Sequence, residues 1–485
     1  MSKIKLLFIL ICTVNICLSA EIKKPNILVI VTDDQGYADL SAYDHSAPDV
    51  KTPNMDRLAK RGILYTNAYS VAPVCSPSRA GWTTGRHPIN WDPKAGFNCG
   101  LPKSIKTMAE MFKANGYKTA RIGKSDYSNK VHRQDIREYP LNHGYDEFLG
   151  FCAHGFDNFL LTKEIEKKTP DPRGHSAALG ELFHNRSKKS YNEGYLTQIF
   201  TDEAIDYLKR NQENPFFLTL SYNLVHHLIH QAPKKYLDKF GVKEIPNYDP
   251  SMGSYNKWFT QYITLGKISD VDMRKYYLAN LNCLDDHIGR VLDTLTDLEL
   301  ADNTIIFFFS DNGGPPTNGA NNKPLSGSKF TLWEGGIRIP FIYCAPGMKK
   351  AGTISDQVIS ALDVLPSSLM HAGIDIPKDL EGEALGDESQ ARNLFWQFNN
   401  SYAVRSGKWK LTKTAVSSRQ PTSGVIDRRQ DANKLGLYNL EDDPGESKDL
   451  SQSHPEIKQR LEKLYQSWFK ERAKDRNHKR KVNKK

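Results

Sequence analysis

Short apolar runs alternate with amphipathic stretches along most of the chain. Residues 25–36, PNILVIVTDDQG, form an apolar run that ends in two aspartates, which is typical of a strand buried on both faces of a parallel sheet. Residues 52–70 have a proline at a helix start, at position 53, and then place apolar side chains at helical spacing. The same succession of helix and apolar strand recurs at 104–126, 197–227 and 276–314. This alternation predicts an α/β fold, with a large, mostly parallel or mixed sheet flanked by helices.

The pattern changes after about residue 385. Residues 393–414 and 434–447 indicate short strands joined by tight turns, as in an antiparallel sheet. From Pro455 to Phe469 the apolar residues lie on one helical stripe, which predicts a helix that docks on that sheet. We therefore expect a large α/β domain at 21–385, a smaller α+β domain at 386–469 and a basic, disordered tail at 470–485.

The first twenty residues differ from both patterns. MSKIKLLFILICTVNICLSA has two lysines, a short apolar run and a small residue at its end. These features predict a secretory signal peptide at 1–20, and hence export to the periplasm or the medium. The run is too short and too interrupted for a stable membrane anchor, and no later stretch is long and apolar enough to span a bilayer.

Composition and charge narrow the function classes. The chain has 485 residues, 39% of them hydrophobic, and a formal net charge of +10. The tail at 470–485 and the lysines of the signal peptide account for most of that charge, so the folded body is nearly neutral. No basic helix with interleaved aromatic residues is present elsewhere, so a nucleic-acid partner is not predicted. Five cysteines follow the signal peptide, and their odd number leaves at least one outside an internal disulfide.

Polar residues gather where three of the predicted strands end: Asp33 and Asp34, His226 and His227, and Asp311 and Asn312. Reactive groups of parallel sheets collect beyond the carboxyl ends of the strands, so these side chains are expected to meet. The four carboxylate and amide residues offer hard oxygen ligands, which suit Ca²⁺ or Mg²⁺ better than zinc. Taken singly, an aspartate pair of this kind is more simply a solvated turn or a helix cap.

Cys75 is the cysteine that most needs an explanation, because Arg79 and a glycine-rich turn follow it closely. A phosphatase-type cysteine has its arginine six positions on, whereas Arg79 is four positions on. A Cys-His protease would need an oxyanion arrangement that nothing local suggests. A buried structural thiol or a disulfide partner remains open from the local sequence.

The run from Cys75 to Arg79, CSPSR, matches the C-x-P-S-R element of type I sulfatases, in which the cysteine is oxidised to formylglycine during export. Four further segments resemble landmarks of that family and occur in its order: PNILVIVTDDQG, TPNMDRLAKRGILYTNAY, SDNGG and GSKFTLWEGGIRIPFI. The chain thus resembles the formylglycine-dependent sulfatases of the alkaline phosphatase superfamily over nearly its whole mature length. The resemblance implies an alkaline-phosphatase-like fold and a large catalytic domain at 21–385.

The resemblance also implies the chemistry of the site. Cys75, once converted to formylglycine (3-oxoalanine), would be the covalent nucleophile, because one hydroxyl of its hydrate attacks sulfur and the other later expels sulfate. Conversion implies a partner, either a formylglycine-generating enzyme or an anaerobic sulfatase-maturating enzyme. The family's cation, Ca²⁺ or else Mg²⁺, would be held by residue 75 together with Asp33, Asp34, Asp311 and Asn312.

Cationic and proton-transferring roles follow from the same resemblance. Arg79 would hold the formylglycine hydroxyl, while Lys124 and Lys329 would bind sulfate oxygens. The leaving oxygen needs a proton, and the family's histidine falls on His226 or His227, of which we favour His226. Many relatives carry a histidine two residues after the lysine that matches Lys124. Here that position is Asp126, which leaves the assignment of a base open.

The substrate is expected to be a sulfated polysaccharide or oligosaccharide, of the algal ulvan, carrageenan or fucan type or a glycosaminoglycan. Aromatic residues crowd into 245–262, which would suit either a sugar-binding platform or a small hydrophobic core. Two alternatives stay open: a phosphonate or phosphate ester hydrolase with the same nucleophile, and an unmatured, carbohydrate-binding relic.

Overall fold

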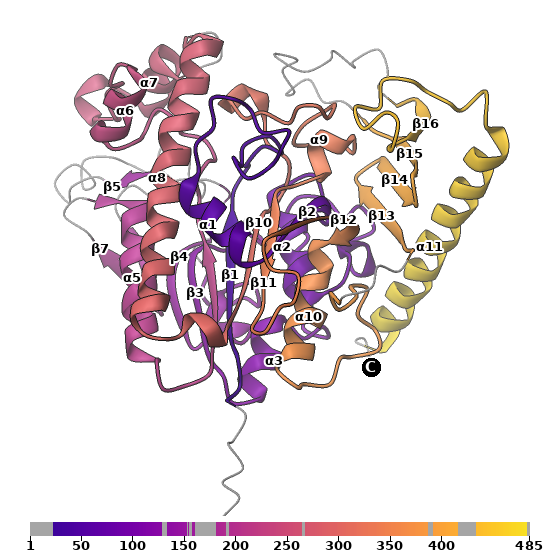
Figure 1. The fold of residues 1–485 in the computed structure, drawn as a ribbon, viewed down its shortest axis with the longest axis horizontal. Coiled ribbons are helices and arrows are strands. Elements are labelled where there is room, and N and C mark those ends of the chain that lie inside the picture. The colour runs from indigo at the N-terminus through magenta and orange to yellow at the C-terminus, as the bar shows by residue number, and fades with distance from the viewer. Residues whose placement is uncertain are drawn as a thin grey trace, which may run out of the picture.

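The computed structural model describes residues 23–128, 133–152, 154, 158–160, 181–190, 194–263, 267–386, 391–415 and 433–482. The predicted signal peptide at 1–20 lies outside these residues. Figure 1 shows a large sheet between two layers of helices, with a smaller sheet and a long helix beside them.

Ten strands form the large sheet, in the order β12-β2-β11-β10-β1-β9-β3-β4-β6-β7. The strands are β1 (Asn26–Thr32), β2 (Ile63–Tyr69), β3 (Lys118–Lys124), β4 (Glu147–Phe151), β6 (Glu181–His184), β7 (Ser187–Ser190), β9 (Phe216–Ser221), β10 (Thr304–Ser310), β11 (Phe341–Cys344) and β12 (Thr353–Ser360). The central strands β10, β1, β9, β3 and β4 run parallel, while β11, β6 and β7 introduce antiparallel pairs. The predicted large mixed sheet is confirmed. A separate two-stranded sheet pairs β5 (Phe159–Leu160) with β8 (Gly194–Tyr195).

The apolar run of β1 is buried on both faces because helices cover the sheet on both sides (Figure 1). Leu28 and Ile30 point into one core, and Ile27, Val29 and Val31 point into the other. The first core is closed by α1 (Pro53–Arg61), α5 (Leu196–Arg210), α6 (Lys234–Phe240) and α8 (Asp270–Asp297). The second is closed by α2 (Cys75–Thr84), α3 (Met108–Ala114) and α10 (Val364–His371). This alternation of side chains anchors β1, and therefore the residues that follow it, at the centre of the molecule.

The C-terminal part forms a four-stranded antiparallel sheet, as predicted from its short strands. Its strands are β13 (Asn393–Phe398), β14 (Ser401–Ser406), β15 (Trp409–Lys413) and β16 (Leu435–Asn439). The long helix α11 (Pro455–Val482) packs on this sheet through Leu461 and its neighbours (Figure 1). The short helix α9 (Glu334–Ile337) lies between the two sheets.

One boundary differs from the prediction. The closing helix was expected to end near Phe469 and to give way to a disordered tail at 470–485, but α11 continues to Val482. Lysine, arginine, glutamate and alanine are good helix formers, and the extension contains neither glycine nor proline, so nothing in it ends the helix. The other domain limits stay predictions.

The aromatic segment at 245–262 proves to be a small hydrophobic core. Tyr248 and Trp258 are buried and pack with Leu228 and Ile263. This cluster lies in and around α7 (Tyr255–Tyr262). A sugar-binding platform built on Trp258 is therefore excluded, because its ring is 1% exposed. Across the described ranges, no helix combines the length and the apolarity needed to cross a membrane.

Candidate active site

The parallel strands bring the predicted site residues to one edge of the large sheet. Asp33 and Asp311 directly follow β1 and β10, whose last residues Thr32 and Ser310 are paired in register. Lys124 ends β3, and Ser221 ends β9. Because these four strands run in the same direction, their carboxyl ends meet at one place, as the strand-end pattern predicts.

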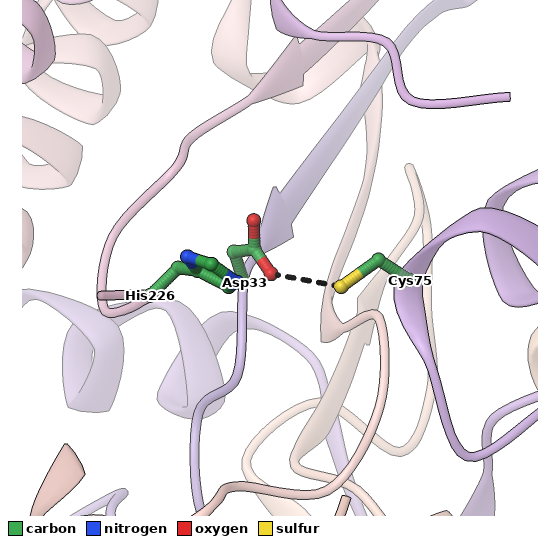
Figure 2. A group of neighbouring side chains, drawn as sticks. All are labelled: Asp33, Cys75 and His226. Atoms are coloured by element: carbon green, nitrogen blue, oxygen red, sulfur yellow. Dashed lines mark hydrogen bonds between the residues drawn. The ribbon is translucent and has the colours of Figure 1, made fainter. Parts of the chain in front are cut away.

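Cys75 enters this place from outside the sheet, as the first residue of α2. Its thiol donates to Asp33 Oδ1 at 3.3 Å, and Lys329 Nζ lies 3.4 Å from the same sulfur. Figure 2 shows the thiol pointing at the Asp33 carboxylate, with His226 near that carboxylate. Burial and the carboxylates of Asp311 and Asp33 raise the pKa of the Cys75 thiol well above its ordinary value. The unmodified side chain is therefore a thiol rather than a thiolate nucleophile.

A set of hard oxygen atoms surrounds Cys75. Ligand atoms of Asp33, Asp34, Cys75 and Asp311 all lie within 4.8 Å of one another, and the four residues are buried. Asn312 extends this set, because its Nδ2 donates to Asp34 Oδ1 at 2.7 Å while its buried Oδ1 has no hydrogen-bond partner among the described residues. Clustered carboxylates and an unpartnered amide oxygen are the donor set that Ca²⁺ or Mg²⁺ prefers, so these residues fit such a cation.

Three buried cations neutralise the carboxylates. Lys124 Nζ lies 2.6 Å from Asp33 Oδ2, and Lys329 Nζ lies 2.7 Å from Asp34 Oδ1. Arg79 donates from Nε to Asp311 Oδ2 at 2.8 Å and from Nη1 to Ser221 Oγ at 2.5 Å. Isolated charges would be very costly at such depth, and these short contacts compensate the carboxylates with nearby cations.

The pKa values of two carboxylates in this set are shifted in opposite directions. Burial alone would raise the pKa of Asp33, but Lys124, His226 and Arg79 outweigh it and hold the pKa well below the usual range. For Asp311, burial and the negative charge of Asp33 raise the pKa instead, against the effect of Arg79. A divalent cation among these oxygens would favour the ionised form of Asp311. The raised pKa of Asp311 is therefore a second feature that fits such a cation.

The structure separates the candidate histidines. His226 lies beside the cluster, with Nε2 3.6 Å from Asp34 Oδ2, and forms a second close group with Asp33 and Cys75 (Figure 2). His227 turns toward α7, where its ring packs against Phe259. His230 is buried against Trp258. Burial and the nearby Lys329 ammonium lower the pKa of His226.

Asp126 has a partner that sequence reasoning missed. The buried carboxylate lies 3.3 Å from Lys124 Nζ and forms an ion pair with Nδ1 of His154, a residue shortly after β4. A signal was present, because His154 follows the end of a parallel strand just as Asp33 and Asp311 do. The pairing itself could not be predicted, since β4 stands beside β3 only in the folded sheet.

Comparison with known proteins agrees with this arrangement. Residues 25–374 match the family model described as sulfatase, and residues 328–474 match the one described as N-sulphoglucosamine sulphohydrolase, C-terminal. The chain is 31% identical to the N-acetylgalactosamine-6-sulfatase of Homo sapiens, covering 91% of this chain and 84% of the relative. It is 29% identical to the ulvan-active sulfatase of Formosa agariphila, covering 87% of this chain and 79% of the relative.

Solved structures extend the similarity to the fold. A crystal structure of Ps i-CgsB in complex with k-i-k-neocarrahexaose superposes with a TM-score of 0.72 at 27% identity, covering 92% of this chain and 93% of the other. The PsFucS1 sulfatase from Pseudoalteromonas sp. has the same fold, with a TM-score of 0.68 at 21% identity, covering 93% of this chain and 91% of that one. The fold and the site thus define a sulfuric ester hydrolase. The chain belongs to the sulfatase family.

Proposed function

We propose that the protein hydrolyses sulfate esters of a sulfated polysaccharide or oligosaccharide, with formylglycine made from Cys75 as its nucleophile and Ca²⁺ as its cation. The observation that carries the proposal is the position of Cys75. It begins α2, matches the maturation motif, and lies within a cluster of hard oxygen ligands that three cations neutralise. A helix N-terminus beside such a cluster favours a bound sulfate group, since its amides carry partial positive charge.

The cation would be held by Asp33, Asp34, Asp311 and the free oxygen of Asn312, together with residue 75. Bound there, the cation would supply positive charge for the sulfate oxygens, and formylglycine at position 75 would supply the hydroxyl nucleophile.

The remaining tasks fall to side chains of this chain. Lys124, which contacts Asp33, and Lys329, which contacts the Cys75 sulfur, bind sulfate oxygens, where charge moves during the reaction. Arg79 is fixed by Asp311 and Ser221, so its guanidinium holds residue 75 in place without rearrangement. His226 donates a proton to the leaving sugar oxygen, because it is the histidine beside the cluster and its imidazole is one-fifth exposed.

The relatives support a sugar as the leaving group. One is an N-acetylgalactosamine-6-sulfatase, another is an ulvan-active sulfatase, and a third protein was solved in complex with k-i-k-neocarrahexaose. We further propose that the protein is exported by the segment at 1–20 and is matured by a formylglycine-generating or anaerobic sulfatase-maturating enzyme.

Sulfate release from a panel of substrates tests the function. The panel contains N-acetylgalactosamine 6-sulfate, ulvan and carrageenan oligosaccharides, 4-nitrophenyl sulfate and 4-nitrophenyl phenylphosphonate, with desulfated oligosaccharides as controls. We expect turnover of at least one sugar sulfate, and a far slower reaction with the phosphonate. Preference for phosphorus would instead identify a phosphonate ester hydrolase.

Cys75 provides the companion test. In enzyme from the native host, the peptide across Cys75 should be lighter than the cysteine form and should react with hydrazides, as an aldehyde does. Cys75→Ser should abolish turnover, because a single hydroxyl cannot eliminate sulfate once it is sulfated. Many turnovers by the Cys75→Ser variant would contradict the mechanism. An unmodified thiol in the Cys75 peptide of enzyme from the native host would instead support an unmatured, carbohydrate-binding relic without sulfatase activity.

A further inference from the structure

We propose that His154, aligned by Asp126, binds the sugar part of the substrate at the edge of the active site, with Phe97 as the wall beside it. The inference rests on the proposed function and adds to it a substrate-binding residue. It starts from position 126, where a fully buried carboxylate stands beside Lys124.

Asp126 contacts two nitrogen-bearing side chains, one through each of its oxygens. Its side chain is completely buried, and its two oxygens have no hydrogen-bond donor among the described residues apart from ion-pair contacts with Lys124 and His154. Lys124 is already engaged by Asp33 at 2.6 Å. Nδ1 of His154 is therefore the group that contacts the other carboxylate oxygen, Oδ1, of Asp126.

This contact also orients the imidazole. Because Nδ1 of His154 is directed at Asp126, Nε2 faces away from the buried carboxylate, and the side chain is 33% exposed. A carboxylate that accepts from one ring nitrogen fixes the tautomer and leaves the other nitrogen to a substrate. His154 thus presents one ring nitrogen at the mouth of the site, behind which Lys124 binds sulfate.

An exposed aromatic ring stands next to it. Phe97 is 44% exposed, and its ring lies edge-on to His154, with 5.9 Å between the centroids. The ring also contacts Phe330, the residue after Lys329, at 5.8 Å. An exposed aromatic face beside a polar nitrogen is the combination that holds a sugar ring, by its apolar face and by its hydroxyls.

The loop that carries Phe97 is tied to the catalytic segment. Asn98 N–H donates to Ser76 Oγ at 3.1 Å, so the loop is bonded to the residue directly after Cys75. Gly100 N–H donates to the carbonyl of Tyr127 at 3.1 Å, which ties the same loop to the residue after Asp126. Phe97 and His154 therefore keep a defined position relative to the nucleophile, as a sugar-binding edge requires.

A double-mutant cycle tests the inference. His154→Ala, Asp126→Asn and the double variant are assayed on 4-nitrophenyl sulfate and on the sugar sulfates named above that the wild-type enzyme turns over. We expect kcat/KM for the sugar sulfate to fall about 10- to 100-fold in each single variant, mainly through KM. For 4-nitrophenyl sulfate, we expect little change in His154→Ala. The double variant should lose no more than the worse single variant, because the two residues act as one unit.

His454→Ala is the matched control. Like His154, His454 is partly exposed, and its Nδ1 pairs with a carboxylate, here that of Glu456. Its ring lies against that of Trp409. Unlike His154, it belongs to the C-terminal part. This variant should keep wild-type kcat/KM on both substrates. Equal losses on both substrates in His154→Ala, additive losses in the cycle, or no loss at all would overturn the inference. A wild-type enzyme that releases no sulfate from any sugar would contradict the proposed function instead.

Discussion

Around Cys75, buried aspartates and buried lysine or arginine side chains neutralise one another's charges. Asp33, Asp34 and Asp311 are each matched by a lysine or an arginine at short distance, all of them buried. Such pairs add little net stability, yet removing one partner leaves a buried charge without compensation. A change at one of these carboxylates should therefore affect metal binding, catalysis and stability together.

Asp311→Asn tests this dependence. The variant should lose its bound Ca²⁺, lower kcat by about 100-fold or more, and lower the free energy of unfolding by roughly 3–5 kcal/mol because Arg79 loses its main partner. Metal content by elemental analysis and urea unfolding measure the first and last effects. Asp285→Asn is the control, since Asp285 is equally buried but accepts from backbone amides at the start of α1. Full metal content in Asp311→Asn would show that the ligand set is wrong.

The C-terminal sheet supports the loop that carries Lys329. Lys410 of β15 is fully buried and lies 2.8 Å from Glu334 of α9 and 3.0 Å from Glu446. Nearby, Leu332 N–H donates to Thr414 Oγ1 at 3.1 Å. These contacts join the smaller sheet to the segment just after Lys329, so the C-terminal part helps to position Lys329.

Lys410→Met tests how much the buried contacts of Lys410 contribute to the free energy of unfolding. The substitution keeps the length of the side chain but leaves Glu334 and Glu446 facing each other in a buried place, so we expect a loss of roughly 3–5 kcal/mol in the free energy of unfolding. Lys408→Met is the control, because Lys408 is 43% exposed and its contact with Glu441 is 3.9 Å long, and it should change stability by less than about 1 kcal/mol. Equal urea midpoints for the two variants would contradict this account.

Buried histidines distributed through the molecule make the fold sensitive to acid. Burial lowers the pKa of His87, His143 and His230 to about 3 in each case. In the unfolded chain a histidine has a pKa near 6.5, so below that pH the unfolded state binds more protons than the folded state. The stability that these residues contribute is complete above about pH 6.5 and declines as the pH falls toward 3.

Urea unfolding at pH 7 and pH 5 measures this effect. We expect each of the three histidines to contribute a loss of up to about 2 kcal/mol between these pH values. His143→Gln, whose amide can still donate to the carbonyl of Arg137 as Nδ1 does, should make the decline with pH smaller. A pH dependence that is unchanged in this variant would show that His143 does not remain neutral in the folded protein.

Much of the site could be predicted because its residues follow strand ends. Asp33 and Asp311 follow apolar runs, and parallel strands carry such residues to one edge whatever their separation along the chain. For Lys124, only its place in the family motif pointed to the site. The choice between His226 and His227 could not be settled in this way. Neighbouring residues at a strand end point in different directions, and only the packing of His227 against Phe259 shows which one faces the cluster.

The amino-acid sequence by itself determined the alternation of helices and strands, the CSPSR run at Cys75 and the oxygen-rich strand ends, because these depend on local pattern and spacing. The tertiary structure alone decided which side chains became partners. Asp126 meets His154, and Lys410 meets Glu334 and Glu446, because sheet order and the docking of two sheets bring distant segments together. The same packing buries Trp258 and leaves Phe97 exposed at the site, although both are simply aromatic residues in the sequence.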